Sequence, residues 1–207
     1  MTTQNTQKDN AVPLRRRLRD ARAALSEAQR DRGSLLIRAR LYTWVGLART
    51  AAREAGRPQL SVIAAFWPLA DEPDLRDLLN QWVEAGITVA LPVVRGADQP
   101  LEFRAWSPDA PMREGAYGIP EPLDGAAVTP ELVLVPTLGF TANADRVGYG
   151  GGYYDRTLAA LKAAGHAFTA IGIAWSCGRL DDGHVPAPHD VRLDGVLTPD
   201  GWVPKAP

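Results

Sequence analysis

The chain is poor in cysteine and has no long hydrophobic run. Cys177 is its one cysteine among 207 residues, which excludes a disulfide framework. No second cysteine or positioned base accompanies it, so we expect a half-buried packing residue rather than a nucleophile. No apolar run approaches the roughly 20 residues that a membrane span needs, and the polar residues 2–10 do not resemble a signal peptide. These absences predict a cytoplasmic protein without a membrane partner.

Two common nucleotide-binding motifs are also missing. No glycine is followed by lysine, which excludes a P-loop. A dinucleotide fingerprint would need a glycine where Tyr153 stands. Histidine is a poor ligand for Mg²⁺, and we assign none of the three histidines to catalysis. A nucleotide site would therefore have to be built in another way.

Charge is balanced overall but not along the chain. The net charge is −1, yet residues 1–57 hold 13 Lys and Arg against 5 Asp and Glu. A nucleic-acid surface would interleave aromatic residues with these arginines, and the pI of about 6.3 is far from basic. We therefore expect no nucleic-acid partner, and a solvated helix face explains most of these arginines. The polar residues 1–12 are expected to be a disordered tail before a single domain, 13–207.

The most informative feature that is present is a cluster of glycines. Four of the five residues 148–152 are glycine, and an amphipathic helical pattern follows directly. Glycine allows positive φ and close approach of a ligand, so successive N–H groups can converge on an anion. Arg146 before the cluster suits phosphate oxygens, and Asp155 after it suits a Mg²⁺ that the phosphates carry. A nucleotide site is the functional interpretation, and a glycine-rich surface turn is the structural alternative.

Helices and strands alternate along the chain without a repeat. Pro13 suits a first helical position, and in the helix that follows Arg15, Arg19 and Arg22 form a stripe beside a leucine stripe. A capping box at 26–29 opens a second helix that ends near residue 56. Further helices are expected at 74–85 and 153–164. The expected strands are 60–66, 87–91, 132–135, 168–174 and 196–197, with 101–106 as an extra or edge strand.

Buried strands separated by helices predict an α/β fold, in which a sheet is covered by helices. Ligands bind to such sheets beyond the carboxyl ends of the strands. The candidate functional residues follow predicted strands in this way, at 67–72, 136–155 and from 175 onward. We therefore expect them to meet at one edge of the sheet.

Several sequence blocks, taken in order, resemble the 5-formyltetrahydrofolate cyclo-ligase family, also called methenyltetrahydrofolate synthetase, from about residue 13 to residue 199. The blocks are 15–19, 66–72, 91–94, 118–122, 135–140, 146–155, and 188–190 followed by 193–194. The glycine block is similar to the family's Arg-Leu-Gly-Arg-Gly-Gly-Gly-Tyr-Tyr-Asp. The resemblance implies a three-layer Rossmann-like α/β sheet with helices on both faces, related to sugar-phosphate isomerases and CoA transferases.

The resemblance also implies a reaction. 5-Formyltetrahydrofolate would be closed to 5,10-methenyltetrahydrofolate in an ATP- and Mg²⁺-dependent step that releases ADP and phosphate. Because a formamide oxygen is a poor leaving group, it would first receive the γ-phosphoryl group, after which N10 attacks and phosphate departs. The protein would then mainly position the substrates and stabilise charge. A monomer that binds only these small molecules is expected.

The resemblance assigns roles position by position. Arg19 and Arg146 would act in catalysis. The residues expected to contact the folate are Trp67, Glu72 and Tyr117, and those expected to bind Mg²⁺ are Asp155 and Asp190. The residues expected to contact ATP are Arg15, Arg16, Arg17, Leu18, Arg19, Arg146, Val147, Gly148, Tyr149, Gly150, Gly151, Gly152, Tyr153 and Tyr154.

Structural alternatives stand beside these roles. Glu72 could cap the helix that begins near residue 74, Trp67 could belong to the core, and Tyr117 could be a packing residue. The sequence departs from the family at Arg15, where lysine is usual, and at Tyr149, where arginine is frequent. The second departure removes a positive charge near the phosphates, so another guanidinium compensates or Tyr149 has a different role, such as stacking. A related isomerase or transferase, and a non-catalytic nucleotide-binding module, are the alternative functions.

Overall fold

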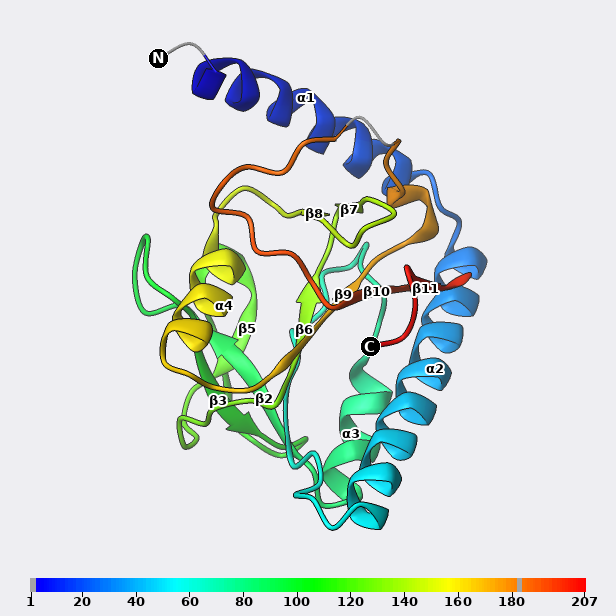
Figure 1. Ribbon diagram of the computed structural model, residues 1–207, viewed down its shortest axis with the longest axis vertical. Coiled ribbons are helices and arrows are strands. Elements are labelled where there is room, and N and C mark those ends of the chain that lie inside the picture. Colours follow the sequence, from blue (N-terminus) through cyan, green and yellow to red (C-terminus); the bar gives the residue numbers. More distant parts are fainter. Residues whose placement is uncertain (1–2, 182–183) are drawn as a thin grey trace.

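The computed structural model describes residues 3–181 and 184–207, with side chains from residue 12 onward. In this part of the chain helices surround a seven-stranded sheet (Figure 1). The α-helices are α1 (Thr3–Ala23), α2 (Glu27–Glu54), α3 (Arg76–Glu84) and α4 (Tyr153–Ala163). The strands of the central sheet are β1 (Val62–Ala64), β2 (Thr88–Val93), β3 (Glu102–Trp106), β6 (Leu132–Pro136), β9 (Thr169–Ile173), β10 (Gly195–Thr198) and β11 (Gly201–Val203).

The central sheet has the strand order β11-β10-β9-β6-β1-β2-β3. The five inner strands run parallel, and β3 and β11 pair antiparallel at the two edges. From β1 the chain goes to β2 on one side and later places β6 on the other, so the order reverses between β1 and β6. In sheets of this kind a ligand crevice opens beyond the carboxyl ends of the strands at the reversal.

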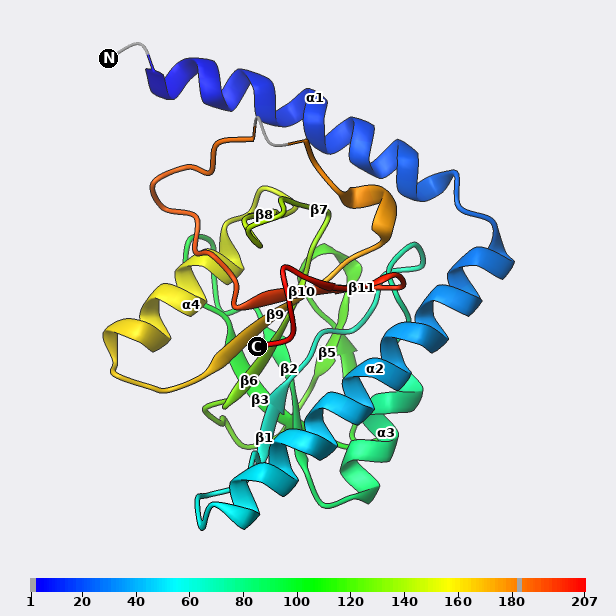
Figure 2. The same ribbon diagram turned by 45° about the vertical axis from the view of Figure 1, so that its right-hand side comes forward.

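Helices cover both faces of the sheet. α2 and α3 pack on one face and α4 on the other, while α1 crosses the edge where the parallel strands end (Figures 1 and 2). Because side chains alternate along a strand, Ile63 packs with α2 and α3 whereas Ala64 lies in the cluster on the α4 side. Burial of each large core side chain stabilises the fold by about 1.5–3 kcal/mol.

The start of α2 follows from its sequence. The side chain of Ser26 accepts a hydrogen bond from the N–H of Gln29, and Gln29 Oε1 accepts one from the N–H of Ser26, which completes the predicted capping box.

Further along α2, a Cβ at Gly33 would lie 2.5 Å from the Trp175 ring. Glycine there allows α2 to approach the segment that follows β9.

Most predicted elements are confirmed, including the edge strand at β3. The predicted helix start at Pro13 is wrong, because α1 begins at Thr3 and Pro13 lies inside it. A proline within a helix removes one backbone hydrogen bond, and here the helix continues past it. That residues 1–12 form a separate tail stays a prediction.

Short irregular elements were missed. They are β4 (Met112–Glu114), β5 (Pro120–Pro122), β7 (Gly139–Phe140), β8 (Arg146–Val147) and the 3-10 helices η1 (Ala116–Gly118) and η2 (Ser176–Gly178), together with β11. Strands of two or three residues show no alternation of polar and apolar residues that a sequence pattern could detect. β4 and β5 form a hairpin whose tip contacts the start of α4 through Tyr117 and Tyr153.

Candidate active site

The glycine cluster links β8 to α4 at the carboxyl edge of the sheet. Gly150 and Gly152 have φ of 101° and 68°, a region that favours glycine. Gly152 is the N-cap of α4, and no side chain caps the helix there. The first N–H groups of this 11-residue helix are thus without a side-chain partner and face the loop, in the arrangement that binds anions.

Arg146 lies directly beneath this loop. It is 6% exposed, and its Nη2 donates to Asp155 Oδ2 at 2.7 Å. A Cβ added at Gly148 would come within 2.5 Å of Arg146 Nη1, so the loop backbone approaches the guanidinium closely at that position. The buried Nε of Arg146 has no hydrogen-bond partner among the described residues. A buried, unpaired donor under a glycine loop fits a phosphate oxygen.

The helix α1 brings arginines to the same loop. Leu18 is 4% exposed and packs with Leu138, Val147 and Leu180, which anchors α1 across the edge. One turn earlier, Arg15 Nε donates to the carbonyl of Gly148 at 3.0 Å. Leu18 and Val147, both expected to contact ATP, therefore have their side chains in an apolar cluster.

The other arginines of the N-terminal block differ from Arg15. Arg16, Arg17 and Arg19 are exposed and make no hydrogen bond or ion pair within residues 12–181 and 184–207. The structure brings Arg15 to the glycine loop and leaves Arg19 in solvent one turn away. A catalytic role for Arg19 stays a prediction.

A residue that the predicted site omitted, Arg22, lies at its centre. Arg22 is 2% exposed and donates to the hydroxyl of Tyr149 and to the carbonyl of Thr137. Its Nη1 is 3.5 Å from Asp71 Oδ2 and 3.8 Å from Glu72 Oε1. The Tyr149 hydroxyl in turn donates to Glu72. The signal was present, because Arg22 shares the arginine stripe of Arg15 on α1.

Burial sets the protonation preferences of this network. It raises the pKa of Glu72, and this rise is opposed by hydrogen bonds from Tyr149 and from the N–H of Leu69 and by the charge of Arg22. Burial and the charge of Glu72 raise the pKa of Tyr149, so its hydroxyl stays a neutral donor. Glu72 is not a cap of α3, since its carboxylate accepts from Leu69 and Tyr149, whereas the N–H of Arg76 is bonded to Asp74.

Asp155 contacts both Arg146 and the segment that carries Asp190. Asp155 Oδ1 accepts from the N–H of Val191 at 3.1 Å, whereas the Oδ2 of the preceding residue, Asp190, accepts from the N–H of Ala187. Mg²⁺ prefers oxygen ligands and is usually held by one or two carboxylates together with phosphate oxygens and water. The described residues contain no cluster of three acidic, histidine or cysteine ligands. The carboxylates of Asp155 and Asp190 therefore fit a Mg²⁺ ion that is also bound by phosphate oxygens.

Aromatic residues frame the opposite side of the network. Trp67, half-buried after β1, packs edge-on against Trp106 with ring centroids 6.0 Å apart. Tyr117, at the tip of the β4–β5 hairpin, is 76% exposed, and its hydroxyl is 3.1 Å from that of Tyr153. The hairpin tip thus touches the start of α4. Tyr154 instead turns inward to the core cluster on the α4 side.

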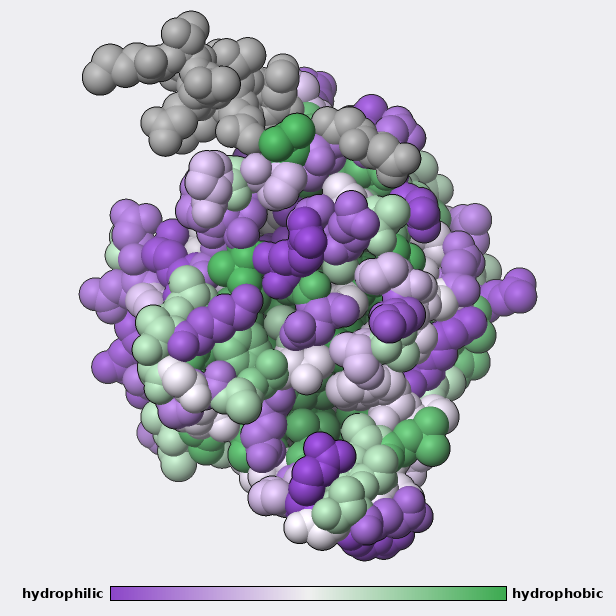
Figure 3. All heavy atoms as spheres, viewed as in Figure 1, coloured by the Kyte–Doolittle hydropathy of each residue, from purple (hydrophilic) through white to green (hydrophobic). Residues whose placement is uncertain are grey.

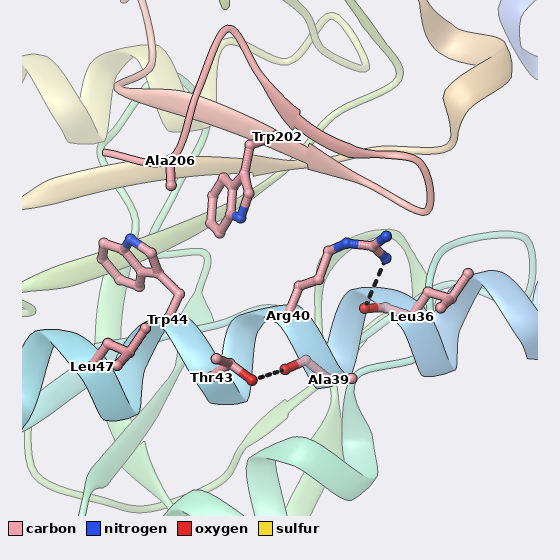
Figure 4. Close-up of a pocket in the computed structure, with 8 residues that line it drawn as sticks. All are labelled: Leu36, Ala39, Arg40, Thr43, Trp44, Leu47, Trp202 and Ala206. Carbon is pink, nitrogen blue, oxygen red and sulfur yellow. Dashed lines mark hydrogen bonds between the residues drawn. The ribbon is translucent and has the colours of Figure 1, made fainter.

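Three other features take no part in this site. Cys177 is exposed rather than half-buried, and desolvation raises the pKa of its thiol, which does not favour a thiolate. His189 is exposed beside Asp190. A cavity of about 400 Å³ lies between α2 and the β11 region, where Trp44 and Trp202 face each other (Figure 4). Its lining includes neither the glycine loop nor an acidic residue.

No helix among the described residues has the length and hydropathy that crossing a membrane requires.

Known proteins are similar to this chain over much of its length. A model of the 5-formyltetrahydrofolate cyclo-ligase family matches residues 6–199. The 5-formyltetrahydrofolate cyclo-ligase of Mycolicibacterium smegmatis is 33% identical over 147 residues, which make up 66% of this chain and 73% of that protein.

Two solved structures of proteins described as 5,10-methenyltetrahydrofolate synthetases share the fold. The one from Aquifex aeolicus has a TM-score of 0.70 and 24% identity, and the match covers 93% of this chain and 91% of that chain. The one from Mycoplasma pneumoniae has a TM-score of 0.67 and 23% identity, and the match covers 91% of this chain and 98% of that chain. At this level of identity the two structures support the fold alone.

Proposed function

The chain belongs to the 5-formyltetrahydrofolate cyclo-ligase family, and we propose that it converts 5-formyltetrahydrofolate and ATP to 5,10-methenyltetrahydrofolate, ADP and phosphate. The observation that carries the proposal is the glycine loop over the buried, partly unpaired Arg146. The sheet, with parallel inner strands and helices on both faces, supports the finer assignment to the Rossmann-like class shared with sugar-phosphate isomerases and CoA transferases.

The chemistry asks for positioning and charge stabilisation. Transfer of the γ-phosphoryl group to the formyl oxygen turns a poor leaving group into phosphate, and N10 of the folate then attacks the formyl carbon. No nucleophilic side chain is needed in this route. Charge on the transferring group is met by Arg146 and by the uncapped N–H groups at the start of α4. Asp155 and Asp190 would hold Mg²⁺, which supplies further positive charge to the phosphates.

The two substrates would occupy neighbouring parts of the site. ATP phosphates would lie on residues 148–154, with Arg15 and the block 15–19 of α1 beside them. The folate would lie between Trp67 and Tyr117, where the Glu72 carboxylate suits the amino and N–H donors of a pterin. Tyr149 lies at the junction, because it belongs to the loop and contacts Glu72.

An absorbance assay tests the activity. Purified protein is mixed with 5-formyltetrahydrofolate, ATP and Mg²⁺, and the methenyl product is followed together with ADP. We expect the methenyl product and ADP to form together. Neither should form when ATP or 5-formyltetrahydrofolate is left out. A folded protein that forms neither product would contradict the proposal. Mg²⁺-ATP binding without folate-dependent turnover would indicate a binding module instead.

We also propose that the protein acts in the cytoplasm as a monomer, without nucleic acid. The net charge of −1 and the mixture of hydrophilic and hydrophobic residues on the face in Figure 3 support this view. Size-exclusion chromatography with light scattering should give a mass near 22.4 kDa. A mass twice that value would contradict the monomer.

Arg15 and Arg19 are expected to differ in their effect on ATP use. Arg15→Ala removes a guanidinium in contact with the loop, so the KM for ATP should rise about tenfold to hundredfold, the effect of one lost charge-assisted contact. Arg19→Ala should raise it less, because that side chain is exposed. Initial rates at varied ATP measure both, with Arg53→Ala on α2 as the control. Equal effects of Arg15→Ala and Arg53→Ala would exclude a phosphate role for Arg15.

Folate affinity is expected to depend on pH through Glu72. Above its pKa the carboxylate is ionised and accepts the pterin donors; below its pKa it is protonated and accepts them poorly. Because burial raises this pKa above the ordinary value of 4.5, binding should weaken at a higher pH than an ordinary glutamate would cause. Glu72→Gln should bind folate roughly tenfold more weakly and without this pH step.

Isothermal titration with 5-formyltetrahydrofolate from pH 7.5 downward measures both proteins. Titration of the ligand itself affects both alike and cancels in their ratio. An identical pH profile in the two proteins would rule out Glu72 as the folate carboxylate. A lowered melting temperature with normal folate affinity in Glu72→Gln would assign the residue to structure.

A further inference from the structure

The Glu72 carboxylate is closed off by the glycine loop. Glu72 is 7% exposed, and each of its oxygens has a partner in the chain. Oε1 accepts from the Tyr149 hydroxyl, and Oε2 accepts from the N–H of Leu69 at 3.0 Å. The first partner belongs to the loop that would hold the ATP phosphates. Each carboxylate oxygen could accept a second hydrogen bond, but Glu72 is nearly buried, so a pterin reaches it only if Tyr149 and its loop move.

Arg22 holds Tyr149 in the position that covers Glu72. Its guanidinium donates to the Tyr149 hydroxyl and lies 5.5 Å from the centre of the Tyr149 ring. It is also 3.8 Å from Glu72 Oε1. Because Leu18 anchors α1 one turn away, Arg22 is a fixed point in the site. Tyr149, in contrast, lies between two glycines.

Those glycines give the loop a way to move. Gly150 has a φ of 101°, a conformation in which glycine meets little steric restriction. The residues 148–152 carry the N–H groups that a phosphate would draw toward itself. Reorientation of these groups displaces the side chain of Tyr149, since it is attached to the same short segment. The hydrogen bond that closes Glu72 thus connects segments 77 residues apart in the sequence.

We infer that Tyr149 is a positioning residue whose hydroxyl keeps the loop over Glu72 until nucleotide occupies the loop, so that ATP promotes folate binding. The inference rests on the proposed function and adds to it an order of binding, in which nucleotide precedes folate. Coupling between two binding sites is reciprocal, so folate must tighten nucleotide binding by the same factor. A hydrogen bond to a charged group corresponds to about a tenfold change in affinity.

The test compares folate affinity with and without nucleotide. 5-Formyltetrahydrofolate is titrated calorimetrically into the whole protein, alone and saturated with Mg²⁺ and a non-hydrolysable ATP analogue. In the unmodified protein we expect binding about tenfold tighter with the analogue. In Tyr149→Phe, folate should bind without nucleotide nearly as tightly as with it. Tyr42→Phe makes the same change on an exposed tyrosine of α2 and should keep the tenfold ratio.

Every outcome decides the inference. The same ratio in Tyr149→Phe as in the unmodified protein would overturn it, and so would a ratio of one in the unmodified protein. Weak folate binding by Tyr149→Phe in both states would make the hydroxyl part of the folate surface instead, which also overturns it. If this variant does not fold, a ratio of one in the unmodified protein, measured in both directions, still overturns the inference.

The proposed function fails in a different way. In that case neither the unmodified protein nor either variant binds 5-formyltetrahydrofolate, with or without nucleotide, although the ATP analogue still binds. If folate binds but nucleotide does not strengthen its binding, only the role of Tyr149 is contradicted.

Discussion

Replacing Arg146 by methionine is expected to lower kcat/KM for ATP by about 100- to 1,000-fold, the range seen when one preorganised donor to a developing charge is removed. Arg146 is buried under the glycine loop, and its Nε has no partner among the described residues. Its interaction with a bound phosphate would therefore be little screened by water. Initial rates of methenyl product formation at varied ATP measure the loss.

Two measurements separate this effect from misfolding. Removing the guanidinium also leaves Asp155 without its 2.7 Å ion-pair partner, so the melting temperature of Arg146→Met is needed alongside the rates. Arg53→Met, on an exposed site of α2, is the matched control and should retain full activity. A folded Arg146→Met protein with kcat/KM within tenfold of the unmodified protein would remove Arg146 from the catalytic machinery.

Asp155→Asn is expected to reduce kcat by about 100-fold or more and to raise the Mg²⁺ concentration needed for half-maximal rate. A carboxylate that ligates Mg²⁺ contributes both charge and a hard oxygen, and the amide keeps only a weak ligand. Asp155 also faces Arg146, so its loss changes the charge next to the phosphates. Rates measured over a Mg²⁺ titration, with total ATP held constant, show both effects.

Asp190→Asn provides the comparison. If both carboxylates serve one ion, this variant should shift the Mg²⁺ dependence in the same direction, because Asp190 adjoins the residue that donates to Asp155. Asp194 lies four residues further on and accepts from the N–H of Ala170, so Asp194→Asn should affect stability and leave the Mg²⁺ dependence unchanged. An unchanged Mg²⁺ dependence in Asp155→Asn would exclude the proposed metal role.

The sheet and the glycine loop could be predicted from sequence because their signals are local. Short apolar strands, a capping box at Ser26 and glycines before an amphipathic helix each act through neighbouring residues. The parallel order then brings the strand ends together. Placement of the glycine loop and of residues 67–72 at one edge follows from these rules.

The contact of Arg22 with Tyr149 and Glu72 could not be predicted in the same way. It depends on where α1 crosses the edge of the sheet, which Leu18 sets through packing with distant residues. The stripe on α1 pointed to Arg15, Arg19 and Arg22 equally, and only burial distinguishes the exposed Arg19 from the other two. The hairpin that carries Tyr117 was missed because its strands are three residues long.

The position of α1 has a consequence for the synthesis of the protein. α1 is translated before the sheet, yet Arg15 contacts the carbonyl of a residue 133 positions later, and the apolar anchor of α1 includes Leu180. The contacts that hold α1 over the edge of the sheet therefore cannot all form until residue 180 has been translated. The entropic cost of closing so long a loop grows only slowly with its length, so late docking is thermodynamically inexpensive. A chain that ends before Leu180 would carry every arginine of α1 and lack part of the cluster that holds this helix in place.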